Sequence, residues 1–424
     1  MSDPKPQVPS PKCQDLRQFV VQHKMTTDTK GTVALLEELN KLAKPLNANN
    51  GFTDEDTRTQ FVEAAEKLAI AARYPDENIF FAVTRITQNA AIRIACSLNI
   101  FAVVPSAEDS SISASDIASA VKAEKIVIVR IMRALVSCHI FAEAGEELYA
   151  HNALSRSFLV PETLSMFKEI YDLVGKGAYA LPEFLQKTGW KNPEDYNNSA
   201  FHLGAHTELG LWEYLEADPE KLQAFNNGMR SQATVKAFDS SYPFEAELNR
   251  EAVKEGDIVL VDVGGGRGHA LERVKQRFPG LKGRLVLQDQ KSVVQDAITG
   301  GLSSEIEPQA ASFFEQNPVK NARAYFFRRV LHDWSDPVCR TILSNTVASM
   351  GPESKVLLAE YEVPAVGASA KLTLQDINMM GLGGTERTEK QWSDLLDSVG
   401  LKLNKMWRTE GSNFVVVEGR LKSA

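Results

Sequence analysis

The carboxyl-terminal half of the chain alternates short apolar runs with amphipathic stretches. The apolar runs predict buried strands, and the stretches, in which apolar residues recur every three or four positions, predict helices. Strands that alternate with helices at this spacing are typical of a doubly wound parallel sheet with helices on both faces. We expect strands at 258–263, 285–288, 325–327 and 356–360, and helices at 270–277 and 337–350.

The end of the chain has its own pattern. Thr388 and Gln391 form a capping box that should open a last helix, and Gly400 should end it. Residues 402–408 and 414–420 then alternate as two strands do, and we expect them to close the sheet as an antiparallel pair.

A different pattern covers residues 87–152. Apolar periodicity predicts helices at 90–98, 113–121 and 124–139, followed by a β-hairpin at 141–150, and together these elements indicate a winged helix. A winged helix either places its third helix in the major groove of DNA or serves as a scaffold that packs two subunits together. The third helix carries few basic residues and the chain is acidic, so the scaffold is favoured.

Helices are also expected near the amino terminus, at 13–25, 32–46 and 53–73, whereas residues 1–12 are polar and rich in proline and offer little surface to bury. In the second helix, Leu35, Leu36, Leu39 and Leu42 form an apolar stripe that needs a partner. We predict two domains, a helical and winged-helix domain over 1–155 and a domain over 156–424 that begins with linking helices rich in aromatic residues.

The composition of the chain argues against some classes of partner. The chain has 424 residues, of which 43% are hydrophobic and 24% charged, and its formal net charge is −8. Nucleic-acid binding depends on clustered Lys and Arg, so no nucleic-acid partner is expected. The four cysteines are widely spaced and no apolar run is long enough to cross a bilayer, which favours a cytoplasmic protein without a membrane partner.

A glycine-rich turn follows the strand at 258–263, in the run Asp262-Val-Gly264-Gly265-Gly266-Arg267-Gly268. Glycine at a turn from strand to helix lets a ligand approach the bare backbone. The spacing does not fit a dinucleotide fingerprint, because His269 and Leu271 stand where the third glycine would be needed.

Two acidic residues sharpen the prediction. Asp262 lies two residues before the first glycine, where a carboxylate would repel a pyrophosphate but suit a ligand with an ammonium group. Asp289 ends the next strand, roughly 20 residues further on, where an acid can accept the two hydroxyls of a ribose. S-adenosylmethionine carries an ammonium, a ribose and no phosphate, so we predict it as the cofactor.

Three runs then resemble a known family: 260–266 (LVDVGGG), 330–336 (VLHDWSD) and 383–392 (GGTERTEKQW). They are similar to class I O-methyltransferases of the caffeate and flavonoid type, in the branch found in fungal secondary metabolism. The likeness covers residues 85–424. It implies a Rossmann-like methyltransferase sheet, an amino-terminal dimerisation domain, a homodimer, and transfer of a methyl group to a hydroxyl of a small aromatic or polyketide or alkaloid molecule.

The resemblance also implies roles for single residues. His332 would be the general base, with Glu360 and Glu386 on either side of its ring. The residues that would bind the cofactor are Gly264, Gly265, Gly266, Asp289, Ser312, Phe313 and Arg328. Ser312 departs from the family, which usually has an acid near the adenine amine. No metal site is expected, because no further ligand accompanies the spaced pair His202 and His206.

An imidazole is suited to this chemistry because its pKa of ~6.5 lets it take a phenolic proton near neutral pH. An apolar acceptor pocket is expected, with Phe225, Met229, Trp334, Met379 and Met380 as candidate wall residues. One alternative stays open: an enzyme on the same scaffold that binds S-adenosylmethionine without consuming it and catalyses a pericyclic reaction or a dehydration.

Overall fold

The computed structural model describes residues 29–44, 46, 51–52, 54–233, 241–249, 252–254, 256–409 and 411–422, but not the side chains of residues 55 and 229–233. These residues form two compact units, one ending at Ile92 and the other beginning at Arg93. The helix predicted at 13–25 lies outside the described residues.

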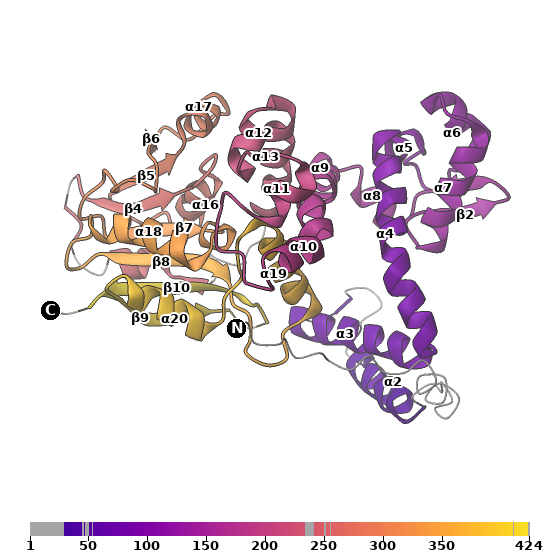
Figure 1. Ribbon diagram of the computed structural model, residues 1–424, viewed down its shortest axis with the longest axis horizontal. Coiled ribbons are helices and arrows are strands. Elements are labelled where there is room, and N and C mark those ends of the chain that lie inside the picture. The colour runs from indigo at the N-terminus through magenta and orange to yellow at the C-terminus, as the bar shows by residue number, and fades with distance from the viewer. Residues whose placement is uncertain are drawn as a thin grey trace, which may run out of the picture. The chain divides into compact units, whose positions relative to one another are not determined.

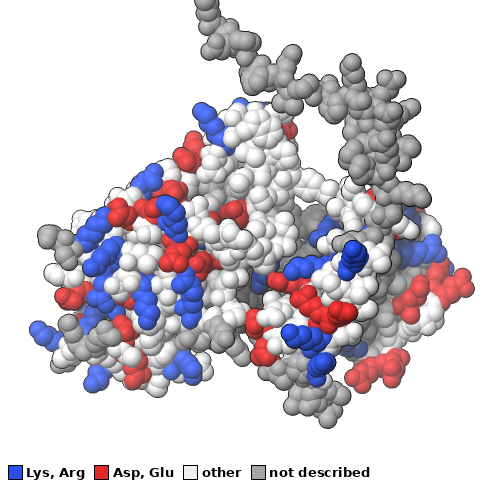
Figure 2. All heavy atoms as spheres, turned by 90° about the horizontal axis from the view of Figure 1, so that it is seen from below, with Lys and Arg blue, Asp and Glu red and all other residues white. Residues whose placement is uncertain are grey.

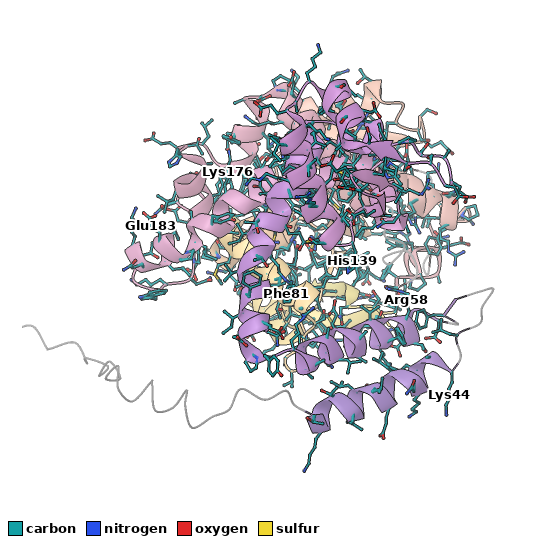
Figure 3. The ribbon with its side chains drawn as sticks, turned by 90° about the vertical axis from the view of Figure 1, so that its right-hand side faces the viewer. Lys44, Arg58, Phe81, His139, Lys176 and Glu183 are labelled. Atoms are coloured by element: carbon teal, nitrogen blue, oxygen red, sulfur yellow. The ribbon has the colours of Figure 1, made fainter. Side chains whose placement is uncertain are left out.

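In the amino-terminal unit, the helices α2 (Thr29–Ala43) and α3 (Glu55–Ala72) pack side by side (Figures 1 and 3). The side chain of Asp54 caps α3 by accepting the backbone N–H of Thr57, and the helix predicted at 53–73 is confirmed. The next helix, α4 (Pro75–Ser97), is much longer than the helix predicted at 90–98 and continues into the second unit.

The winged helix is present in the second unit. Helices α5 (Ile100–Val103), α6 (Ala114–Val121) and α7 (Lys125–Ser137) precede the hairpin strands β2 (Ala142–Gly145) and β3 (Leu148–Ala150). A third strand, β1 (Ile112–Ser113), pairs with β3 and was missed, because two residues are too short for a periodicity. Ser113 then caps α6, since its side chain accepts the N–H of Asp116.

A series of short helices leads to the sheet, in agreement with the linking helices predicted at the start of the second domain. One of them, η1, is a π-helix, in which the wider turn shifts the side chains that follow it. The series comprises α8 (Ala153–Ser157), α9 (Pro161–Glu169), η1 (Ile170–Val174), α10 (Gly175–Lys187), α11 (Ala200–Ala205), α12 (Leu211–Glu216), α13 (Pro219–Ala233) and α15 (Phe244–Leu248).

The central sheet has seven strands in the order β6-β5-β4-β7-β8-β10-β9. Its first five strands in that order are parallel, and β10 joins β8 and β9 in antiparallel fashion, which confirms the predicted closing pair. The strands are β4 (Ile258–Val263), β5 (Arg284–Asp289), β6 (Ile306–Ala310), β7 (Ala324–Arg328), β8 (Lys355–Tyr361), β9 (Leu401–Arg408) and β10 (Phe414–Leu421).

Helices cover both faces of this sheet (Figure 1), so the doubly wound fold is confirmed. Alternate residues of each strand point to opposite faces, and each face has its own apolar core. The helices are α16 (His269–Arg277), α17 (Lys291–Thr299), α18 (Asp336–Val347), α19 (Ala370–Leu382) and α20 (Glu389–Ser398). Of these, α17 and α19 were missed, as was β6, which carries a proline and an exposed polar pattern.

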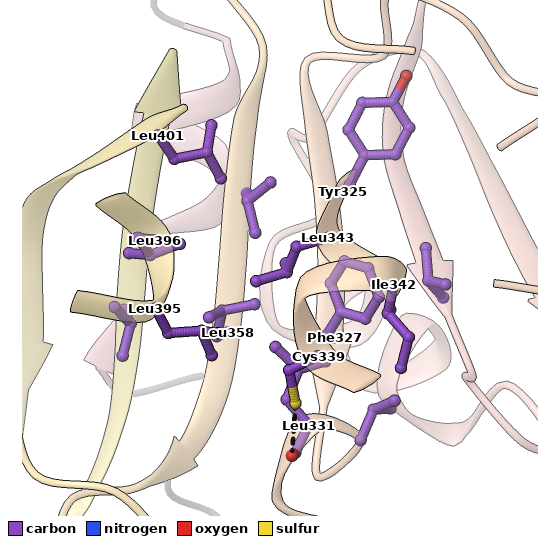
Figure 4. Packing of buried hydrophobic residues seen from close by; sticks show 14 of the residues in the cluster. Tyr325, Phe327, Leu331, Cys339, Ile342, Leu343, Leu358, Leu395, Leu396 and Leu401 are labelled. Atoms are coloured by element: carbon purple, nitrogen blue, oxygen red, sulfur yellow. Dashed lines mark hydrogen bonds between the residues drawn. The ribbon is translucent and has the colours of Figure 1, made fainter. Parts of the chain in front are cut away.

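One of the two cores lies directly behind the turn that carries His332. Figure 4 shows Leu331 packed with Cys339 and Ile342 of α18 and with Leu358 of β8. The thiol of Cys339 donates to the carbonyl of Leu331 over 3.2 Å, which ties α18 to this turn. The turn is therefore supported by a close-packed layer.

Acidic and basic side chains lie among one another on the face drawn in Figure 2. Such a mixture gives a solvated surface rather than a continuous field of one sign. Among the described helices, none is both long enough and apolar enough to span a lipid bilayer.

Candidate functional site

A cavity of about 670 Å³ opens at the carboxyl ends of β4, β5 and β7. Its volume is in the range of pockets that hold small molecules. One wall consists of turns that follow the strands, and the other consists of apolar helix residues, which include Met166, Ile170, Leu173, Trp212, Phe225 and Met379. The cavity therefore offers a polar wall and an apolar wall to whatever it binds.

The glycine turn, residues 264–268, forms part of the polar wall. Gly264 and Gly266 have backbone φ angles of 70° and 60°, a left-handed conformation that favours glycine. A β-carbon on Gly266 would have no protein atom within 4 Å, whereas one on Gly265 would lie 2.5 Å from the carboxylate of Asp262. Gly266 thus leaves open space beside the backbone, and Gly265 allows close packing.

Asp289, at the end of β5, faces the glycine turn. Its Oδ2 accepts the N–H of Gly266 over 2.8 Å, and its Oδ1 accepts the N–H of Gln290 over 2.8 Å. Burial raises the pKa of this carboxyl, although the two N–H groups favour its ionised form. The carboxylate is fixed at the cavity wall and has lone pairs left for further donors.

Asp262 is fully buried beneath the same turn. Neither of its carboxylate oxygens has a hydrogen-bond partner among the residues that the structure describes. Burial raises the pKa of Asp262 to about 7, and the positive charge of Arg328 acts against that rise. A buried carboxylate without a partner is costly, and a cationic group bound nearby would reduce the cost.

Three other predicted residues lie at the cavity wall. Arg328, at the end of β7, is close enough to Asp262 for their charges to interact, and burial lowers the pKa of Arg328. Ser312 and Phe313 follow β6. The Phe313 ring stacks edge-on against Trp334, with ring centroids 5.8 Å apart, and the Ser312 hydroxyl accepts the N–H of Phe314 over 3.2 Å.

His332 is on the short 3₁₀ helix η2 (Leu331–Asp333), in the turn that follows β7. We call residues 330–334 the histidine turn. The side chain of His332 is almost fully buried, yet it lines the cavity. Its Nδ1 lies 3.1 Å from Oε1 of Glu386, and its Nε2 lies 3.3 Å from Oδ1 of Asp333. The imidazole is therefore held between two carboxylates.

The two predicted glutamates have different positions. Glu386 contacts the ring of His332, whereas Oε1 of Glu360 accepts the backbone N–H groups of Val330 and Leu331, each over 3.0 Å. The prediction placed both carboxylates against the ring; in the structure, the hydrogen bonds of Glu360 go to the backbone just before it. Glu360 thus fixes the turn, and Glu386 fixes the ring.

Charges around His332 act in opposite directions. Burial and the positive charge of Arg329 oppose protonation of the imidazole, but Asp333 and Glu386 outweigh them, and the pKa of His332 is raised above its ordinary value. Burial likewise opposes ionisation of Glu386, yet His332 and Arg329 hold the pKa of that carboxyl below its usual value. The pair therefore favours a charged or strongly polarised hydrogen bond.

Arg387 was not singled out from the sequence, although it lies within the run 383–392. Its guanidinium is fully buried and donates to the carbonyls of Leu331 (3.0 Å) and Trp334 (2.9 Å) and to the carboxylate of Asp336 (2.9 Å). An arginine between Glu386 and Thr388 gives no signal of burial in a sequence. In the fold, Arg387 clamps both ends of the histidine turn.

The loop before α20 adds two backbone contacts to this clamp. The N–H of Thr385 donates to the carbonyl of His332 over 2.9 Å, and Gly384 lies so close to that carbonyl that a β-carbon would collide with it. The N–H of Glu386 donates to Asp376 of α19 over 2.8 Å. These contacts set the position of the Glu386 carboxylate.

The apolar candidates divide into three groups. Phe225, Trp334 and Met379 line the cavity. Met380 does not, because it packs on the other side of α19 against the cluster of Leu181, Phe184 and Ala200. The side chain of Met229 lies outside the described residues. Sequence reasoning missed the polar residues that α19 contributes to the cavity, namely Lys371, Gln375 and Asn378.

His202 and His206 do not come together with other metal-binding side chains. The Nδ1 of His202 lies 3.0 Å from the Ser199 hydroxyl. Over the part of the chain that the structure describes, no group of three or more His, Cys, Asp or Glu residues has an arrangement that could hold a metal ion.

Comparisons with known proteins point to one family. The model of the O-methyltransferase domain matches residues 191–402, and the model of the O-methyltransferase dimerisation domain matches residues 83–161. An O-methyltransferase of Pestalotiopsis microspora is 39% identical over 398 residues, which cover 94% of this chain and 98% of the relative.

Two solved structures share the fold over 93% of this chain and all of theirs. The crystal structure of OxaC in complex with sinefungin and meleagrin has a TM-score of 0.85 at 29% identity. The structure of the LepI complex with SAM has a TM-score of 0.82 at 25% identity.

Proposed function

Since the chain belongs to the plant and fungal type of O-methyltransferases, we propose that it uses His332 as the base that takes the proton of an acceptor hydroxyl on a small apolar molecule. The observation that carries this proposal is the position of the imidazole. It is fixed by Glu386 on one side, is supported by a packed core, and lines the cavity that also contains the glycine turn.

The residues at the glycine turn fit S-adenosylmethionine, the cofactor of this family of enzymes. Gly266 leaves room for a ligand against the backbone, and Asp289 can accept two ribose hydroxyls. Asp262, which has no hydrogen-bond partner among the described residues, offers the negative charge that an ammonium group requires. Arg328, Ser312 and Phe313 would complete the wall around the nucleoside. When bound, the cofactor supplies a methyl group on a positively charged sulfur.

The protein then has to align the acceptor and remove its proton. With Nδ1 of His332 donating to Glu386, Nε2 carries the free electron pair. Transfer would form the bond from the acceptor oxygen to the methyl carbon while the methyl–sulfur bond breaks and leaves a neutral thioether. The proton of the acceptor hydroxyl would go to Nε2, whose N–H could then donate a second hydrogen bond of the ring, to Asp333. Glu360 takes part only by holding the backbone of Val330 and Leu331 in place.

The acceptor is proposed to be a flat, apolar molecule with a hydroxyl, such as an aromatic polyketide, an alkaloid or a phenol. The wall formed by Met166, Ile170, Trp212, Phe225 and Met379 supports this class, because aromatic and methionine side chains make adaptable apolar contacts.

His332→Gln tests the base assignment. We expect the variant to bind S-adenosylhomocysteine within a few-fold of the wild type, as measured by calorimetry, but to transfer label from [methyl-¹⁴C]S-adenosylmethionine to extracted fungal metabolites about 10²–10⁴ times more slowly. Full activity of this variant would refute the assignment. Loss of binding together with activity would instead indicate a damaged pocket.

The likeness to the LepI structure, together with a solved structure described as a pericyclic reaction enzyme that also has a TM-score of 0.82, gives the alternative chemistry one specific support. The histidine held by a glutamate favours methyl transfer. The same labelling experiment separates the two: a metabolite that is consumed while the label stays in the cofactor would favour the alternative.

We also propose that residues 1–155 form the dimerisation domain of a homodimer and residues 156–424 the catalytic domain. The match to the dimerisation model supports this, as does an exposed apolar series on α4, namely Ile79, Phe80, Val83 and Ile86. The stripe that includes Leu36 belongs to the same proposal. A stable monomer in sedimentation would overturn it. A cytoplasmic location stays a prediction.

A further inference from the structure

Arg329 follows β7 directly and has an unusual backbone conformation. Its φ is 55°, in the left-handed region that a long side chain seldom adopts. The conformation is held by its own N–H, which donates to the carbonyl of Ala359 in β8 over 3.1 Å. The strained backbone turns the Arg329 side chain out of the strand direction and into the cavity wall, where it is found.

The guanidinium has two neighbours. It lies over the ring of Tyr361, 4.9 Å from the centroid, and its Nη1 donates to Oε1 of Glu386 over 3.3 Å. The same oxygen atom lies 3.1 Å from Nδ1 of His332. The other oxygen, Oε2, has no hydrogen-bond partner among the described residues. One carboxylate oxygen is therefore shared by a permanent cation and by the imidazole.

This sharing matters because of the charges around the ring. Asp333 faces it from the histidine turn, Glu386 from the loop before α20, and Glu360 approaches it from β8. Carboxylates favour the imidazolium, which cannot act as a base. Arg387 is engaged with the carbonyls of the turn and with Asp336, so it does not balance Glu386.

We propose that Arg329 is a positioning residue for the His332 base: it fixes the shared oxygen of Glu386 and limits how strongly that carboxylate favours the imidazolium. The inference rests on the proposed function, because the unprotonated form of the His332 ring is needed only if His332 acts as the base. It assigns Arg329 no contact with the acceptor.

The decisive measurement is the titration of His332 itself, which needs no acceptor. The full-length protein is labelled with ¹³C-histidine, the His332 signal is assigned by its loss in His332→Gln, and its pKa is followed by NMR. In Arg329→Gln we expect the pKa to rise by about one unit, a tenfold change in the protonation equilibrium. Arg329→Lys, which keeps the charge, should stay near the wild-type value.

Two further variants make the result specific. Arg329→Asn suits the left-handed backbone and should show the same rise, so it replaces Arg329→Gln if that variant does not fold. Arg267→Gln removes another cation of the cavity wall, one that pairs with Asp296 at 3.2 Å, and should leave the His332 titration unchanged.

A wild-type titration in folded Arg329→Gln or Arg329→Asn would overturn the inference, as would an equal rise in Arg267→Gln. Failure of the proposed function looks different: His332→Gln would keep its methyl transfer while the titrations of Arg329 variants still shifted. If transfer is as proposed, Arg329→Gln should lose activity near neutral pH and recover most of its kcat about one pH unit higher.

Discussion

The two halves of the cavity wall are built in different ways. The glycine turn is held by its own backbone and by the carboxylate of Asp289, and below it the buried carboxylate of Asp262 has no hydrogen-bond partner among the described residues. The histidine turn is held by side chains from distant segments, namely Glu360, Arg387 and Glu386. At the site proposed for a charged ligand, a charge is left for that ligand to meet, whereas the turn proposed to carry the base is already held by three side chains.

Loss of the side chain that clamps the histidine turn should have the largest effect, a lower free energy of unfolding. Arg387→Met leaves the carbonyls of Leu331 and Trp334 buried without donors and Asp336 without its cation, and we expect a loss of about 3–5 kcal/mol in the free energy of unfolding. Urea denaturation followed by fluorescence measures it.

The matched control is Arg408→Met. Arg408 pairs with Glu362 and Glu389 in an exposed position, and its loss should cost about 1 kcal/mol or less. Equal effects of the two substitutions would show that the histidine turn does not depend on the buried clamp.

The glycine turn should respond in binding rather than in stability. Gly266→Ala adds a methyl group to the open space beside a left-handed backbone, and we expect the affinity for S-adenosylhomocysteine to fall by about tenfold or more. Gly301→Ala provides the control, because Gly301 has a φ of 90° and open surroundings but does not line the cavity. If both variants bound equally well, ligand contact at Gly266 would be excluded.

The unpartnered carboxylate predicts a pH dependence of cofactor binding. Because burial raises the pKa of Asp262 to about 7, the group is neutral below that pH and ionised above it. An ammonium ligand prefers the ionised form, so affinity for S-adenosylhomocysteine should rise as the pH rises from 6 to 8, by at most about tenfold per unit. In Asp262→Asn, calorimetry should give weak binding with a flat pH profile, and a wild-type slope in that variant would contradict the assignment.

Ser312 should matter least. Its hydroxyl accepts a backbone N–H and lies at the rim of the cavity, so Ser312→Ala should weaken S-adenosylhomocysteine binding by only about two- to fivefold, that is by about 0.5–1 kcal/mol. A loss of a hundredfold would mean that this position has a larger part in holding the adenine than its geometry indicates.

The regular part of the fold was predictable because it depends on local patterns. The strand at 258–263 and the capping box of Thr388 and Gln391 match the structure. Two of the missed strands are short or polar: β1 has two residues, and β6 carries a proline and exposed side chains. For such segments, pairing partners in the sheet decide the structure, and a sequence does not display them.

Some residues of the candidate site were likewise predictable from local patterns, and others were not. The glycines and Asp289 follow from spacing after consecutive strands, since parallel strands bring their ends to one edge. Arg329 and Arg387 do not, because a charged side chain in a loop is usually solvated, and only the folded chain shows that Arg387 is buried and that Arg329 shares an oxygen with His332. The different targets of Glu360 and Glu386 also required the tertiary structure.

The helix α19 bears on how substitutions could alter the selectivity of the enzyme for its acceptor. Asp376, in the middle of the helix, accepts the N–H of Glu386, and Gly384, just beyond the helix, has no room for a side chain against His332. Lys371, Gln375 and Asn378 of the same helix line the cavity without taking part in these contacts. On the proposed function, substitutions at these three positions change the wall that meets the acceptor and leave the contacts of the histidine turn in place, so they are natural positions to randomise when new acceptors are sought.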